Sequence, residues 1–143
     1  MKEYNAAFFN LFQNMFLSLK DKFGEQEALA CFREIMEKGL NEAYGDDFVK
    51  GSTESFANVV GERDKNVGLE VKFNNIQEDA ITYEFHTDPF PKLKGLLPSH
   101  ILDGIYMNFK VKHLLGDDWK YKTKSHLWDG AHCTQHHIYK EAA

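Results

Sequence analysis

A chain of 143 residues, 43% of them hydrophobic and 14% aromatic, is long enough to form one domain with a sizeable core. Its formal net charge of −5 leaves no basic excess to neutralise phosphates, so nucleic acid is not an expected partner. No apolar run approaches the roughly 20 residues that a membrane span needs, and two distant cysteines do not form a disulfide framework. We therefore expect no membrane partner and a cytoplasmic location.

Residues 1–63 of the single predicted domain, 1–143, are expected to form a helical part. Apolar side chains recur at the helical i+3/i+4 spacing in residues 3–23 and again in residues 25–45. A shorter third helix is predicted to begin at Ser52 or Thr53. The charged stretch GERDKNVG that follows is predicted to be a solvated turn.

Residues 64–143 are predicted to contain a sheet and the candidate site. The apolar period changes to two, which is typical of strands, and a further helix interrupts the strand pattern. The predicted strands cover residues 66–73, 80–86, 119–127 and 132–139, and the helix lies within 97–116. The order ααα-ββ-α-ββ predicts an α+β fold, with the N-terminal helices packed on one face of a four-stranded antiparallel sheet.

The C-terminal stretch KSHLWDGAHCTQHHIYK contains four of the seven histidines and one of the two cysteines. Asp129-Gly130 in its middle is a strong hairpin signal. A two-residue turn would place His126 opposite Cys133, whereas a three-residue loop would place Ser125 opposite Cys133. We favour the three-residue loop, because it gathers the more aromatic face in the interior: Trp119, Tyr121, Cys133, His137 and Tyr139.

Cys133 is the candidate nucleophile, because a thiolate beside a histidine is a common activated nucleophile. His137 lies about 13 Å away along the same strand, so His126 or His86 would have to supply the histidine. Asp88 before Pro89 and Asp103 in a helix are candidates to orient that base or to transfer protons. The ordinary alternatives are a packed apolar thiol, a turn aspartate and an aspartate that favours the helix dipole.

A metal site is the alternative interpretation of the histidine-rich C-terminal stretch. Histidine, cysteine and aspartate side chains are suitable ligands, and zinc is the metal that such a set favours. The spacing matches no zinc motif, so surface or hydrogen-bonded histidines are the commoner outcome. The first metal candidates are His126, Cys133 and His137, and the wider set of suitable ligands adds His86, His132, His136 and Asp88.

The second half of the chain resembles a known family in three short stretches, FHTDPFPKLKG, HILDGIYMNF and KTKSHLWDGAHCTQHHI. It is similar to L-2-amino-thiazoline-4-carboxylic acid hydrolase-like proteins, whose pattern has Cys-Pro after a strand, an Asp on a helix, and Gly followed by Cys in a last hairpin. Asp88 stands here where the family has the cysteine before proline. The order of elements also resembles the 4-vinyl reductase and TRAPP-type ligand-binding fold.

The resemblance implies a hydrolase that opens a C–N or C=N bond of a small heterocyclic carboxylate. Cys133 would be the nucleophile or a ligand, His126 or His137 the base, and Asp88 or Asp103 the orienting carboxylate. The alternative is a non-catalytic domain that binds a small ligand or a metal. Its aromatic pocket would be lined by Phe85, Phe90, Trp119, Tyr121 and Trp128, with His86 and His137 as polar contacts. A homodimer contact through Phe8 and Phe9 is the alternative to their packing in the core.

Overall fold

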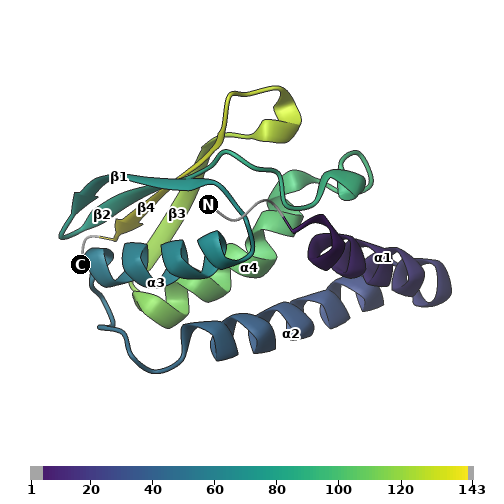
Figure 1. The fold of residues 1–143 in the computed structure, drawn as a ribbon, viewed down its shortest axis with the longest axis horizontal. Coiled ribbons are helices and arrows are strands. Elements are labelled where there is room, and N and C mark those ends of the chain that lie inside the picture. Colours follow the sequence, from purple (N-terminus) through teal and green to yellow (C-terminus); the bar gives the residue numbers. More distant parts are fainter. Residues whose placement is uncertain (1–4, 142–143) are drawn as a thin grey trace.

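The computed structural model describes residues 5–141 and confirms the predicted α+β fold (Figure 1). Four α-helices and four strands lie within these residues. The helices are α1 (Ala6–Phe23), α2 (Glu25–Tyr44), α3 (Thr53–Asn66) and α4 (Ser99–Leu114). The strands are β1 (Val71–Gln77), β2 (Ala80–Phe85), β3 (Trp119–Ser125) and β4 (Thr134–Lys140). Short 3-10 turns, η1 (Pro91–Leu93) and η2 (Leu127–Asp129), follow β2 and β3.

The four strands form one sheet in the order β1-β2-β4-β3, and every pairing is antiparallel. The central strands are therefore β2 and β4, which are far apart in sequence. Their register places Glu84 opposite Gln135 and Phe85 opposite Thr134. The end of β2 thus lies beside the start of β4, and this neighbourhood contains most of the chemically useful side chains.

The helices cover one face of the sheet in two layers. Helices α3 and α4 contact the sheet, and α2 packs on α4 with α1 beyond it (Figure 1). The covered face bears Ile81, Tyr83 and Phe85 of β2, all buried as the strand alternation predicts. Side chains of alternating strand positions point to the opposite face, which no helix within residues 5–141 covers.

The aromatic residues of α1 pack inside the chain. Phe9 is 2% exposed and lies edge-on against Phe90, with ring centroids 5.7 Å apart. Phe8 is half-buried against Phe9 and Phe12. The predicted homodimer contact is therefore wrong for Phe9, because its ring is already part of the core.

The predicted first strand is placed too early. Helix α3 continues through Asn66, and Gly68 follows with a φ of +81°, a conformation that glycine adopts without steric cost. The strand therefore begins only at Val71.

No helix within residues 5–141 is both long enough and apolar enough to cross a membrane.

Candidate functional site

The register of the last hairpin differs from the one favoured by the sequence. Lys122 pairs with His137 and Thr123 with His136, and a bulge then shifts the pairing so that Ser125 lies opposite Gln135. Residues 126–133 connect the strands through η2 rather than through either predicted tight turn. Because a one-residue slip exchanges the two faces, Thr134, His136 and Ile138 are the buried residues of β4. The prediction that Cys133 and His137 lie in the interior is wrong.

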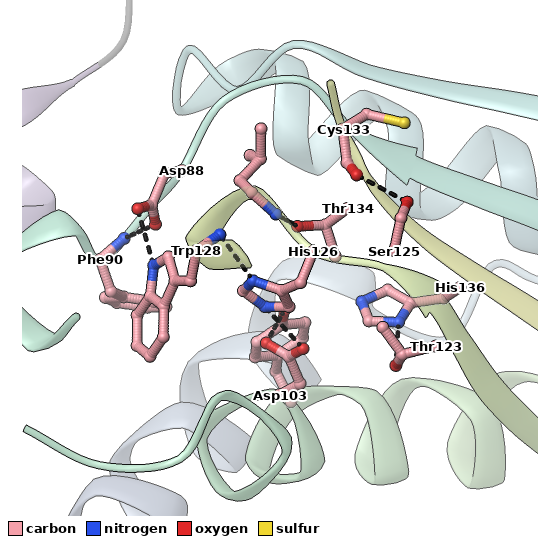
Figure 2. Close-up of polar contacts among 12 residues, drawn as sticks. Asp88, Phe90, Asp103, Thr123, Ser125, His126, Trp128, Cys133, Thr134 and His136 are labelled. Carbon is pink, nitrogen blue, oxygen red and sulfur yellow. Dashed lines mark hydrogen bonds and ion pairs between the residues drawn. The ribbon is translucent and has the colours of Figure 1, made fainter. Parts of the chain in front are cut away.

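Asp103 and His126 meet on the helix-covered side of the sheet (Figure 2). Asp103 is on α4 and His126 precedes η2, and both side chains are buried. His126 Nε2 lies 3.0 Å from Asp103 Oδ2, although Oδ2 accepts no aligned hydrogen bond within the described residues. The Tyr106 hydroxyl donates to Asp103 Oδ1 at 2.8 Å. The result is a buried carboxylate–imidazole pair.

The other nitrogen of His126 accepts a hydrogen bond from the Trp128 backbone N–H, at 3.0 Å. Nδ1 must then be unprotonated, so the neutral ring carries its proton on Nε2, toward Asp103. Burial lowers the pKa of His126, but the contact with Asp103 and the charge of that carboxylate outweigh burial and leave the pKa raised.

Trp128 covers this pair. Its indole Nε1–H donates to Asp88 Oδ2 at 2.8 Å, and its ring lies against the His126 ring with centroids 5.4 Å apart. Asp88 is fixed in turn, because its Oδ1 accepts from the Phe90 N–H at 2.9 Å. A pocket of about 10 Å³ remains between these groups and α4, which is about the space that one water molecule needs.

Cys133 belongs to a different cluster. Figure 2 shows its sulfur pointing away from His126, and its carbonyl accepts from the Ser125 hydroxyl at 2.8 Å. One ligand atom each of Cys133, Glu84 and His86 lies within 4.8 Å of the others. Of the two histidines expected beside Cys133, the structure therefore confirms His86 and not His126. Asp88, Asp103 and His126 gather on the covered face, and Cys133 does not join them.

Glu84 and His86 form the carboxylate–imidazole part of this second cluster. His86 Nε2 lies 3.2 Å from Glu84 Oε1, and the Gln135 amide donates to Glu84 Oε2 at 2.9 Å. The hydrogen bond from Gln135 lowers the pKa of Glu84, burial opposes this effect, and His86 adds to the lowering. Sequence reasoning missed Glu84, although its i, i+2 spacing with His86 on one strand face was a usable signal.

The remaining predicted site residues are dispersed. Phe90 borders the pocket beside Trp128, whereas Trp119 and Tyr121 lie farther along β3 beside a different pocket, next to α4. His137 faces outward and stacks on Tyr139, with centroids 5.7 Å apart. The predicted metal set of His126, Cys133 and His137 is not among the groups that can hold a metal within residues 5–141.

His136, one of the histidines considered as a metal ligand, is buried in the core. Its Nδ1 lies 2.9 Å from the Thr123 hydroxyl, while Nε2 is buried without a hydrogen-bond partner. Burial lowers the pKa of His136 to about 4, with Lys110 adding to the effect and Asp103 opposing it. His136 therefore stays neutral inside the folded chain at neutral pH.

A second cluster of buried polar side chains connects α3, β2 and α4. The Tyr83 hydroxyl donates to Asp64 and accepts from the Lys110 ammonium, which is 2.9 Å away. Arg63 also contacts Asp64, at 3.1 Å. Burial lowers the pKa of Lys110 to about 8, although Asp64 acts in the opposite direction. The prediction of a solvated turn is wrong for Asp64, which is 0% exposed.

Comparison with known proteins assigns no family. A scan against protein-family models finds no match to this chain, and a search of curated proteins finds none either.

Proposed function

We propose that this chain binds a small cyclic amidine, such as a thiazoline carboxylate, and hydrolyses its C=N bond. The observation that supports this proposal is the way Trp128 occupies the site. Its two N–H groups donate to two acceptors, His126 Nδ1 and Asp88 Oδ2, at 3.0 and 2.8 Å. When Trp128 moves aside, both acceptors lose their donor in a partly buried position, which is costly unless a ligand replaces it.

A ligand that replaces Trp128 should therefore bring two N–H donors and a flat body. An amidine group supplies such donors, and its positive charge is complementary to the carboxylates of Asp88 and Asp103. Phe90 and Tyr106 border the same pocket and offer flat apolar contacts. The resemblance to thiazoline-carboxylate hydrolases points to the same class of heterocycle. The closed pocket holds about one water molecule, and the donor to His126 Nδ1 is the backbone N–H of Trp128. Binding therefore requires the η2 turn to move aside as a lid together with the indole of Trp128.

The proposed chemistry uses His126 as the base and Asp103 as its orienting carboxylate. Displacement of Trp128 frees Nδ1, while the proton on Nε2 stays directed at Asp103. Nδ1 then takes a proton from a water molecule as that water adds to the amidine carbon. The same proton passes to the ring nitrogen as the C–N bond breaks. Cys133 has no role in this step, because its sulfur lies on the other side of the strand.

Turnover of 2-amino-thiazoline-4-carboxylate by purified variants tests the proposal. His126→Gln should lower kcat at least about 100-fold, because proton transfer by a positioned side chain typically contributes that much. Asp88→Ala should raise KM more than it lowers kcat. His137→Gln is the matched control and should behave like the wild-type protein. The proposal fails if His126→Gln keeps full activity, or if Cys133→Ser abolishes turnover while His126→Gln does not.

Binding without turnover is the second candidate. It is favoured because both nitrogens of the His126 ring already have a neighbour, the Trp128 N–H and Asp103 Oδ2. In a Trp119→Phe background the remaining tryptophan, Trp128, reports on the lid by fluorescence. A change in its emission on addition of the amidine, without any product, would establish a binding domain. No change in emission and no product would reject both candidates.

A further inference from the structure

We infer that Glu84, His86 and Cys133 form a zinc-binding site on the open face of the sheet, with the fourth position free for water. This site lies on the opposite side of β2 and β4 from the Asp103–His126 pair, so it does not depend on the function proposed above. Of this set the sequence suggested Cys133 and His86, but not Glu84.

The strands bring the three side chains together. Tyr83 and Phe85 point into the core, so Glu84 between them points to the open face, and His86 continues that alternation. Cys133 directly precedes β4, the strand that pairs with β2 at this end. Glu84 is thus held within β2, whereas His86 directly follows β2 and donates its backbone N–H to the Glu70 carbonyl at 2.8 Å. Cys133 is held at the start of β4 by the hydrogen bond from the Ser125 hydroxyl to its carbonyl.

The distances are close to those of a formed site. Ligand atoms on a tetrahedral zinc lie about 3.3–3.6 Å apart, given zinc bonds of about 2.0–2.3 Å. His86 Nε2 and Glu84 Oε1 are 3.2 Å apart, and all three ligand atoms lie within 4.8 Å of one another. A side-chain adjustment of about 1 Å therefore closes the site, with no change in the sheet.

The donor set favours zinc among the common divalent ions. A thiolate and an imidazole are ligands that zinc prefers, whereas magnesium and calcium prefer oxygen ligands alone. Gln135 holds Glu84 Oε2 at 2.9 Å and leaves Oε1 toward His86, which is the kind of outer contact that orients a ligating carboxylate. The His132 ring lies next to the His86 ring, with centroids 5.6 Å apart.

The test is a zinc titration of the reduced, chelator-treated full chain by calorimetry, with Co²⁺ as a spectroscopic substitute. We expect one equivalent of Zn²⁺ to bind, and the cobalt form to show a thiolate charge-transfer band. Cys133→Ser, His86→Gln and Glu84→Gln should each weaken binding at least tenfold. Cys31→Ser, which removes the other thiol, and His137→Gln, on the same open face, should leave the affinity unchanged.

A measurement on the wild-type chain tests the inference even if the substituted variants fail to fold. One equivalent of Zn²⁺ should slow alkylation of Cys133 in the wild-type chain, while Cys31 reacts at its metal-free rate. The inference is wrong if zinc does not bind, if the cobalt form lacks the thiolate band, or if zinc leaves the alkylation of Cys133 unchanged. Loss of zinc binding with amidine hydrolysis intact would separate this inference from the proposed function.

Discussion

The two faces of the sheet carry similar side chains in different surroundings. On the covered face, Asp103 and His126 are buried, and both nitrogens of the imidazole already have a neighbour. On the open face, Glu84, His86 and Cys133 are only half-buried. The Asp103–His126 pair is buried, so a ligand must displace part of the structure to reach it. The set of Glu84, His86 and Cys133 is partly exposed and is therefore accessible to an ion.

This difference predicts separate consequences for substitutions on the two faces. Polar groups of the covered face contribute to folding, because their loss leaves a buried partner unsatisfied. Those of the open face can exchange their partner for water, so their loss should affect binding rather than stability.

The largest effect is expected at Asp64. Asp64→Asn removes the carboxylate charge that Tyr83, Arg63 and Lys110 contact inside the core. Removing one partner of a buried ion pair typically lowers the free energy of unfolding by about 3–5 kcal/mol. Urea unfolding should show this loss. Asp117→Asn, whose side chain is 84% exposed, is the control and should change the free energy of unfolding by about 0.5 kcal/mol or less. Equal effects at the two positions would mean that Asp64 is not a buried charge.

An intermediate effect is expected for His136, and it depends on pH. The unfolded chain binds a proton at an ordinary histidine pKa of about 6.5, whereas the folded chain binds one only at about 4. Protons therefore favour unfolding between these values, and stability falls as the pH drops from about 6.5 to about 4. His136 should contribute about 3 kcal/mol to that fall.

Unfolding free energies at several pH values test this linkage. His136→Gln should flatten the acid side of the stability profile, while His137→Gln on the open face should retain the wild-type slope. A slope that is unchanged in His136→Gln would show that the buried ring is not held neutral.

The smallest effect is expected at Cys133. In the metal-free protein, Cys133→Ser should change the free energy of unfolding by about 0.5 kcal/mol or less, because its side chain lies on the open face. Thermal unfolding with and without Zn²⁺ separates the two roles, since only the wild-type chain should gain stability from the ion. A large loss of stability without metal would place Cys133 in the core after all.

The fold could be predicted because its signals are local. The alternation of Ile81, Tyr83 and Phe85 identified the covered face of β2, and helical spacing located α1 and α2. The site was harder, because its geometry depends on the pairing of distant strands. The pairing of Lys122 with His137 turns Cys133 to the open face. No residue type in the hairpin indicates the bulge between Thr123 and Ser125 or the longer connection that follows it.

Burial of charge was equally hidden from the sequence. Asp64 lies in a charged stretch that is typical of a solvated turn, yet one more turn of α3 carries it beneath the sheet. Its partners Tyr83 and Lys110 come from β2 and α4, so nothing within the stretch itself indicated them. The burial of Lys110 had one local indication in the sequence, because Lys110 shares a helix face with Met107 and Leu114.

The separation of the two faces can be tested by the imidazole nitrogen spectra of the wild-type protein during a Zn²⁺ titration. The His86 resonances should shift with one equivalent of zinc, while His126 keeps its proton on Nε2 and an unprotonated Nδ1. Movement of the His126 resonances with zinc, or no movement of those of His86, would contradict the assignment of metal binding and acid–base chemistry to opposite faces.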